Sequence, residues 1–544
     1  MESKRNQEQW NPDKRGPKGF AAQMGDEASS EPQSPPRPQP AGGEHGMDEA
    51  VVREMGYQFV DMIVEYWKGL EGRRVYGPLS PVGLDEMFKE SLPEQGAPLA
   101  EVLQEVRTRV FPNTMAIGSR RYFGMMNPAP MPVAVFAEAL ASAMNQNVAS
   151  WRHAPSGTAI EKRVIRWLCD LFGLPETSFG TFVSGGSLAN ITALKLAINR
   201  ALGRHLSQMD RGGPGQDIAK LVFYVSSQGH YSFDKAVDML GIGRNQLRKI
   251  PQDDIFRIDL RFLEESIQAD MAAGRKPACI IGIGGSTNTG SIDKLDKLAE
   301  LARRYDCWFH VDAAYGGAVI LSEMYGPMLR GIDQADSITV DPHKWFYMPF
   351  SAGGILVRDG DFLRQSFLVH PEYYMEKTSD GAEEPPEDRR GFHLGDKVNF
   401  FQYGVQGSRR LNALKLWMAF KMVGRRQYAA WVEKDIELAR ILAARIRRQD
   451  DFQILGPNTL GICNFRWQPQ RPGGGSFTPE ETDQLNRELQ ETVENDGDAW
   501  FSYTMLNGRV ALRVNVENRC MGQSDIERLM TVIRRTADRI LTTK

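Results

Sequence analysis

The sequence predicts an α/β protein whose main part is a mostly parallel sheet, and two patterns indicate this. From about residue 160, stretches with helical periodicity alternate with short, continuously apolar runs. Such runs are typical of strands buried on both faces, and their alternation with helices is typical of parallel sheets. The predicted strands are Leu221–Val225, Cys279–Ile283, Trp308–Asp312, Ser337–Val340 and Gly354–Val357.

Two different segments precede this sheet. Residues 1–46 contain seven prolines and no Leu, Ile or Val. Such a segment buries too little apolar surface to offset its ordering entropy, so we expect a disordered tail. Residues 47–160 are predicted to be helical, because Val51, Met55 and Phe59 recur at four-residue steps and further helical patterns cover about 98–110 and 131–146.

The remainder of the chain predicts a large domain over 161–418 and a small α+β domain over 419–544. Helical patterns at 408–424 and 426–449 are followed by strands at Thr459–Trp467 and Arg509–Val516 and a last helix at 524–541. Residues 370–396 form a long acidic stretch with Gly and Pro. A loop of that length inside a domain is typical of a mobile lid.

Composition excludes several classes of protein. The chain has 544 residues, with 66 Lys plus Arg against 69 Asp plus Glu, a balance that argues against nucleic-acid or anionic-membrane partners. No apolar stretch reaches the roughly 18 residues of a membrane span, and no apolar signal segment opens the sequence. Five widely spaced cysteines without a CxxC pair suit the cytoplasm and predict neither a disulfide scaffold nor a metal site.

Two predicted strands end in residues capable of chemistry. Ser337–Val340 leads into Asp341-Pro342-His343-Lys344-Trp345, where partial desolvation of Lys344 would lower its pKa and let its amine attack an aldehyde. Taken alone, a surface lysine at a strand end is the better interpretation. Asp312 ends the strand Trp308–Asp312, where a buried carboxylate needs a cation such as a protonated pyridine nitrogen. A helix N-cap explains Asp312 equally well on its own.

A third pattern is typical of anion binding. Ser184-Gly185-Gly186-Ser187 directly precedes a helical stretch. Glycines let backbone N–H groups approach an anion, and a helix N-terminus adds a favourable potential. The stretch is neither GxGxxG nor a Walker A loop, which disfavours nucleotide binding. By itself it is also compatible with an ordinary glycine turn.

Together these patterns supply a phosphate cradle, a carboxylate for a ring nitrogen and a nucleophilic lysine, the parts that hold pyridoxal 5′-phosphate (PLP). In order and spacing, Ser184–Asn190, His230, His310–Gly317 and Asp341–Trp345 resemble the fold-type I PLP enzymes, and within them the group II amino-acid decarboxylases. The resemblance extends from about residue 50 to the C-terminus. It implies an N-terminal helical dimerisation segment, a large PLP-binding domain and a small C-terminal domain.

The resemblance also implies a role for individual residues. Lys344 matches the Schiff-base lysine, Asp312 the partner of the pyridinium nitrogen, and His230 the histidine that stacks on the ring. Asp341 stands where the family often has Asn, and a second negative group beside phosphate is unfavourable unless other donors bind it. His343 is therefore preferred to Asp341 as a contact. The other expected cofactor contacts are Gly185, Gly186, Ser187, Thr287 and Ala314.

The same resemblance places a catalytic acid in the lid. Tyr373 matches the tyrosine credited with protonating Cα, with Tyr374 as the neighbour that could be mistaken for it. Relatives with Phe there tend to form aldehydes, so Tyr373 implies an amine product. Thr158, Trp151 and Tyr122 are the expected substrate contacts.

The sequence favours PLP-dependent decarboxylation of an aromatic L-amino acid: tyrosine, tryptophan, phenylalanine or dopa. Aromatic residues around Tyr122 and Trp151 favour such a side chain, whereas Tyr231-Ser232-Phe233 resembles relatives that act on glutamate or cysteine sulfinate. An acidic amino acid or diaminobutyrate is the alternative substrate. A PLP transaminase, a PLP lyase or an inactive PLP-binding protein is the alternative of another class. The family also implies a homodimer with active sites at the subunit interface.

Overall fold

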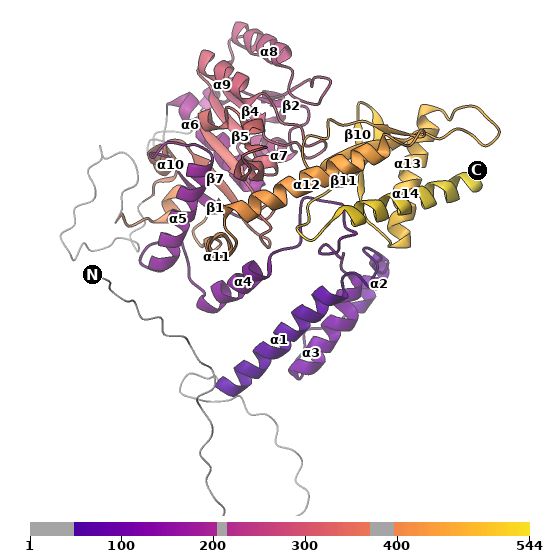
Figure 1. Ribbon diagram of the computed structural model, residues 1–544. Coiled ribbons are helices and arrows are strands. Elements are labelled where there is room, and N and C mark those ends of the chain that lie inside the picture. The colour runs from indigo at the N-terminus through magenta and orange to yellow at the C-terminus, as the bar shows by residue number, and fades with distance from the viewer. Residues whose placement is uncertain (1–47, 204–214, 370–395) are drawn as a thin grey trace, which may run out of the picture. The chain divides into compact units, whose positions relative to one another are not determined.

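The structure, a computed structural model, describes residues 48–203, 215–369 and 396–544. Its larger sheet has seven strands in the order β1-β7-β6-β5-β4-β2-β3 (Figure 1). The strands from β6 to β3 run parallel, whereas β7 is antiparallel to both β1 and β6. This confirms the predicted α/β class. The strands are β1 (Phe179–Val183), β2 (Leu221–Ser226), β3 (Leu247–Ile250), β4 (Lys276–Ile283), β5 (Trp308–Asp312), β6 (Ser337–Val340) and β7 (Gly353–Val357).

Both faces of this sheet are covered. Every residue of β1, β2, β5, β6 and β7 is buried, and successive side chains of a strand point to opposite faces. Two strands, β1 and β3, were not among the predicted runs. The edge strand β3 carries the half-exposed Arg248 and the exposed Lys249, so it lacks the continuous apolar pattern of its neighbours.

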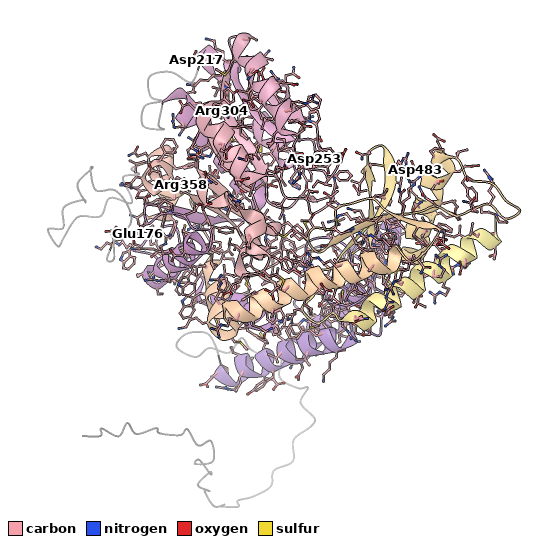
Figure 2. The ribbon with its side chains drawn as sticks, turned by 45° about the horizontal axis from the view of Figure 1, so that its top comes forward. Glu176, Asp217, Asp253, Arg304, Arg358 and Asp483 are labelled. Carbon is pink, nitrogen blue, oxygen red and sulfur yellow. The ribbon has the colours of Figure 1, made fainter. Side chains whose placement is uncertain are left out.

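Helices follow the strands and pack on them. Helix α6 begins at Gly186 and lies against β4, β5, β6 and β7, and small residues such as Ala189 and Ala193 let it approach the sheet closely. Exposed side chains of both signs, including Glu176, Asp217 and Arg304, surround this part of the chain (Figure 2). The helices are α5 (Pro155–Leu171), α6 (Gly186–Leu202), α7 (Ser232–Met239), α8 (Leu260–Ala272), α9 (Leu295–Arg304) and α10 (Gly360–Phe367).

The chain before the large sheet is helical, as predicted. Residues up to Met62 form one unit, and those from Ile63 onward form a second. The helix expected over about 98–110 ends earlier as an α-helix, and Val106–Val110 continues it with wider turns before Pro112. The helices are α1 (Glu49–Gly69), α2 (Pro81–Met87), α3 (Leu99–Glu105) and α4 (Pro132–Met144).

The C-terminal part has a sheet and a core of its own. Four antiparallel strands lie in the order β10-β11-β9-β8, and an apolar cluster joins β8, β9 and β11 to α12, α13 and α14. In the described ranges, none of the helices combines the length and apolarity that crossing a membrane requires. The strands are β8 (Phe452–Ile454), β9 (Ile462–Trp467), β10 (Ser502–Leu506) and β11 (Arg509–Asn515); the helices are α11 (Ala413–Val423), α12 (Arg425–Ile446), α13 (Pro479–Asp496) and α14 (Gln523–Thr542).

Candidate active site

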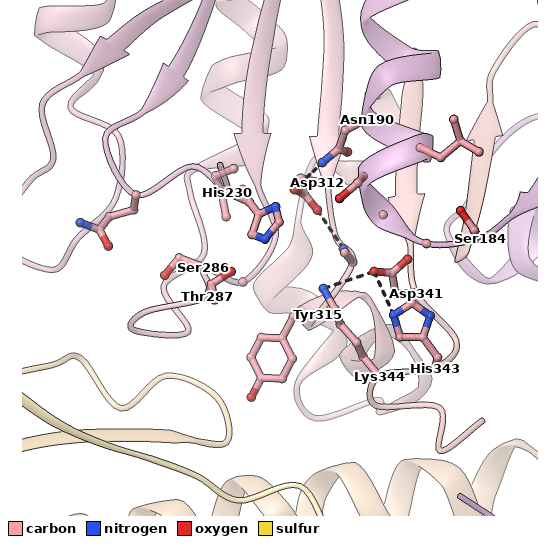
Figure 3. A pocket seen from close by; sticks show the side chains of 18 residues that line it. Ser184, Asn190, His230, Ser286, Thr287, Asp312, Tyr315, Asp341, His343 and Lys344 are labelled. Atoms are coloured by element: carbon pink, nitrogen blue, oxygen red, sulfur yellow. Dashed lines mark hydrogen bonds and ion pairs between the residues drawn. The ribbon is translucent and has the colours of Figure 1, made fainter. Parts of the chain in front are cut away.

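A cavity of about 340 Å³ lies where β1, β2, β4, β5 and β6 end at their carboxyl edges. This is the edge at which open α/β sheets bind ligands, and the volume suits a small cofactor. Figure 3 shows the residues that line it. Nine predicted site residues from five separate segments lie together here: Gly185, Gly186, Ser187, His230, Thr287, Asp312, Ala314, His343 and Lys344.

Lys344 reaches the cavity from the loop after β6. Its Nζ lies 3.2 Å from Asp341 Oδ2, and its side chain is about one-fifth exposed. The next residue, Trp345, is fully buried, stacks on Tyr315 at a ring distance of 5.0 Å and donates from Nε1 to Asp435. The loop is therefore anchored by Trp345, while the preceding lysine keeps its amine in the cavity.

Asp312 is held at the end of β5 by two donors. Asn190 Nδ2 donates to its Oδ2 over 3.0 Å, and the backbone N–H of Ala314 donates to its Oδ1 over 3.2 Å. The side chain is buried at the cavity wall. A fixed, negatively charged acceptor at this place can bind a cationic N–H of a ligand ring.

Three residues that fix Asn190 and, through it, Asp312 had no role predicted from the sequence: Asn190 itself, His310 and Thr339. Asn190 Oδ1 accepts from Thr339 Oγ1 over 2.7 Å and lies 3.1 Å from His310 Nε2. Burial lowers the pKa of His310 to about 4, so its ring is neutral near pH 7. One signal was available: Asn190 shares a helix face with the apolar Leu194 and Ile198, and a polar residue there needs a buried partner.

The beginning of α6 forms an anion cradle. Glycine is required here, because a Cβ on Gly186 would lie 2.8 Å from Asp341 Oδ2. A Cβ on Gly353 of β7 would similarly lie 2.4 Å from the Gly185 Cα. Backbone N–H groups at the helix N-terminus are thus left open to the cavity, where they can donate to a phosphate.

Two histidines line the cavity in neutral form. The Ser232 N–H donates to His230 Nδ1 over 3.2 Å, which leaves Nε2 to carry the proton, and burial lowers the pKa of His230. The Ala352 N–H donates to His343 Nδ1 in the same way, over 3.1 Å. Burial, aided by the Lys344 charge, lowers the pKa of His343 to about 3. Neither ring therefore contributes a positive charge near neutral pH.

The family model of the pyridoxal-dependent decarboxylase conserved domain matches residues 81–468. The chain belongs to this family. The decarboxylase is 32% identical to an aromatic-L-amino-acid decarboxylase of Bacillus atrophaeus over 490 residues, which cover 90% of this chain and 96% of that protein.

Two solved structures resemble the decarboxylase along most of their length. Oryza sativa TDC with PLP and tryptamine has a TM-score of 0.82 and 27% identity, with 91% of this chain and 99% of that chain covered. The second has a TM-score of 0.75 and 29% identity, with 88% of this chain and 95% of that chain covered. It is the glutamate decarboxylase domain of diaminobutyrate-pyruvate transaminase and L-2,4-diaminobutyrate decarboxylase from Vibrio parahaemolyticus. These matches agree with the predicted fold-type I architecture.

PLP is the cofactor of this family, and the cavity of the decarboxylase fits it. The glycine-lined N-terminus of α6 suits a phosphate, the held carboxylate of Asp312 suits a protonated ring nitrogen, and the Lys344 amine suits an aldehyde. The small Ala314 leaves space beside the carboxylate for a flat ring. All of these groups belong to one cavity.

The three expected substrate contacts lie outside this cavity in the single chain. Thr158 is buried in α5, where its Oγ1 donates to the carbonyls of Ala154 and Pro155. Tyr122 stacks on Trp500, and its hydroxyl donates to Asn127 over 2.7 Å. The backbone N–H of Trp151 donates to Asn399 Oδ1 over 3.1 Å. Their contact with substrate stays a prediction, and Tyr373 falls outside the described residues.

Proposed function

We propose that this decarboxylase removes the α-carboxylate of an aromatic L-amino acid and releases the amine and carbon dioxide. The main support for an aromatic substrate is the match to the Bacillus atrophaeus aromatic-L-amino-acid decarboxylase along nearly the whole of both chains. The likeness to Oryza sativa TDC, whose structure contains the aromatic amine tryptamine, supports it. The cavity supplies the groups that such a reaction needs.

Each role in this proposal follows from a position in the cavity. When bound, PLP supplies an aldehyde for attachment to an amine and a ring that withdraws electrons from the bond to be broken. Lys344 provides the amine, and Asp312 holds a proton on the ring nitrogen because Asn190 and Ala314 fix its carboxylate. The cradle of Gly185, Gly186 and Ser187 orients the phosphate. We assign His230 to the face of the ring.

The test is a substrate panel. The purified protein with added PLP is incubated with each of the twenty amino acids and with dopa, and released carbon dioxide is measured. We expect release from aromatic amino acids. Release only from glutamate, aspartate, cysteine sulfinate or diaminobutyrate would instead support the second candidate, which the Vibrio parahaemolyticus structure favours. A keto acid without carbon dioxide would indicate a transaminase, and bound PLP without any product an inactive protein.

Tyr373→Phe is expected to change the product. We assign the Tyr373 hydroxyl to protonation of Cα after carbon dioxide leaves, and phenylalanine cannot donate that proton. With dioxygen as the oxidant and water as co-reactant, the variant should shift product from amine towards aldehyde, ammonia and hydrogen peroxide, which chromatography and a peroxidase assay measure. Tyr374→Phe is the matched control and should keep the amine. An unchanged amine yield in Tyr373→Phe, with loss in Tyr374→Phe, would transfer the role to Tyr374.

We also propose that the decarboxylase is a homodimer, in which residues 47–160 contribute to the interface and the active sites lie at that interface; the predicted lid lies almost wholly outside the described residues. The support lies on α1, where six large apolar side chains are 39–58% exposed. A helix with so much exposed apolar surface is typical of an interface, and a second copy supplies the same surface. These side chains are Val51, Val52, Met55, Tyr57, Phe59 and Val60.

Light scattering after gel filtration should therefore give about twice the chain mass. The double variant Met55→Asp/Phe59→Asp places two charges in the proposed interface, so we expect it to elute as a monomer with less activity. Glu54→Gln on the same helix is the control and should remain dimeric. An active wild-type monomer would refute the interface.

We further propose that the protein works in the cytoplasm. All five of its cysteines are unpaired, and three of them are buried. Free thiols are typical of a reducing compartment. Fluorescent tagging in the source cell tests this, and a secreted or periplasmic signal would contradict it.

A further inference from the structure

Asp341 occupies an unusual position in the cavity. It follows β6, and its side chain is only 2% exposed. Its Oδ2 lies 3.2 Å from Lys344 Nζ and 3.6 Å from His343 Nε2 (Figure 3). Its Oδ1 is buried and has no hydrogen-bond partner among the described residues. A buried oxygen without a partner is costly, and a proton on this carboxyl group would reduce that cost.

The carboxyl group of Asp341 lies against the anion cradle itself. The backbone of Gly186, at the start of α6, packs against it. The space around both oxygens is narrow, because a Cβ on Gly186 would lie 2.8 Å from Oδ2 and a Cβ on Gly353 would lie 2.8 Å from Oδ1. Asp341 therefore lies directly beside the backbone where a phosphate would bind.

The charges that face Asp341 decide whether it can stay ionised beside a phosphate. Lys344 on the same loop is a cation, Asp312 at the end of β5 is a second carboxylate, and His343 is neutral. The N-terminus of α6 adds a favourable partial charge. Burial, reinforced by Asp312, raises the pKa of Asp341 to about 6, and a phosphate dianion nearby would raise it further.

We propose that Asp341 is a phosphate-binding residue that carries a proton whenever PLP is bound, so that binding of the phosphate takes up one proton. This rests on the proposed placement of the phosphate at the start of α6. A carboxylic acid donates its O–H to a phosphate oxygen, and its carbonyl oxygen can still accept a hydrogen bond. A carboxylate in the same place would only repel the dianion.

The test uses pyridoxine 5′-phosphate, which has a hydroxymethyl group in place of the aldehyde and forms no bond to Lys344. Calorimetry gives its Kd from pH 6.5 to 8.5. A group whose pKa is higher in the complex than in the free protein favours binding at low pH, and this contribution to affinity is lost as the pH rises. We therefore expect the wild-type Kd to increase by about tenfold or more across this range. In Asp341→Asn, the slope of log Kd against pH should be several-fold smaller, and binding at pH 8.5 should be tighter than in the wild type.

Two controls isolate the effect. Asp336→Asn removes another carboxyl whose pKa burial raises, but which lies at the opposite end of β6 and outside the cavity, so it should keep the wild-type slope of log Kd against pH. Pyridoxine, which lacks the phosphate, should show equal slopes in wild type and Asp341→Asn. Titrations in buffers of different ionisation enthalpy count the protons on the wild type, which needs no variant to fold.

The outcomes separate this proposal from the function on which it rests. If log Kd for pyridoxine 5′-phosphate changes equally with pH in wild type and Asp341→Asn, the role of Asp341 is overturned, while phosphate binding at the start of α6 is unaffected. If Asp341→Asn does not fold, a wild type that takes up no more protons with pyridoxine 5′-phosphate than with pyridoxine overturns it as well. If pyridoxine 5′-phosphate binds neither protein, the phosphate placement itself is wrong, and this proposal falls with it.

Discussion

Lys344→Ala is expected to lower the rate of carbon dioxide release by at least about a thousandfold. Among the described residues that line the cavity, Lys344 is the lysine. The loop that carries it is fixed by the buried Trp345. Alanine leaves that anchor intact and removes only the nucleophile. The protein should therefore still fold and bind PLP through its phosphate, without a covalent bond.

Borohydride reduction of the PLP-loaded protein followed by peptide mapping checks this directly. In the wild type the tag should fall on the peptide that contains Lys344, and the variant should carry none. Lys195→Ala is the matched control, because burial lowers the pKa of the Lys195 amine to about 8, yet this lysine lies on α6 outside the cavity and donates to Asn199. A tag on Lys195, or a fully active Lys344→Ala variant, would refute the assignment.

Asp312→Asn should lower kcat by about a hundredfold or more, with a smaller loss of PLP affinity. The amide keeps the size of the side chain and an acceptor for the Ala314 N–H, but it carries no negative charge to hold a proton on the ring nitrogen. The lost charge-assisted hydrogen bond should weaken PLP binding by about 1.5–3 kcal/mol. Steady-state kinetics at saturating PLP and a PLP titration measure the two effects separately.

Asp293→Asn serves as the comparison for Asp312→Asn. Asp293 is a buried acid that does not itself line the cavity; it accepts from the Ile258 and Ile283 backbone N–H groups, and burial raises its pKa to about 7. Its replacement should lower the thermal unfolding midpoint while kcat stays near wild type. A drop in kcat as large in Asp293→Asn as in Asp312→Asn would show that the effect arises from stability rather than from the ring nitrogen.

Local sequence was sufficient for the strands that carry the chemistry. The predicted ends of β5 and β6 coincide with the observed ones, Asp312 and Val340, because a continuous apolar run stops where the chain leaves the sheet. The same pattern failed for β3, whose exposed edge carries Arg248 and Lys249. It also could not separate a catalytic lysine from a surface lysine at Lys344, since the neighbours that bury the loop come from distant segments.

Local periodicity and residue type were enough to predict the α/β class, five of the seven strands of the large sheet and the chemical groups at the ends of β5 and β6. Only the tertiary structure decided which of those groups meet. Asn190 reaches Asp312 across 122 residues and Thr339 across 149, because α6 lies over the neighbouring strands β5 and β6. From the sequence we expected Asp341 to be an unfavourable neighbour for a phosphate. In the structure its carboxyl group packs against Gly186 and lies beside the Lys344 amine. Strand order and helix packing arise from contacts between distant segments, and no local pattern contains them.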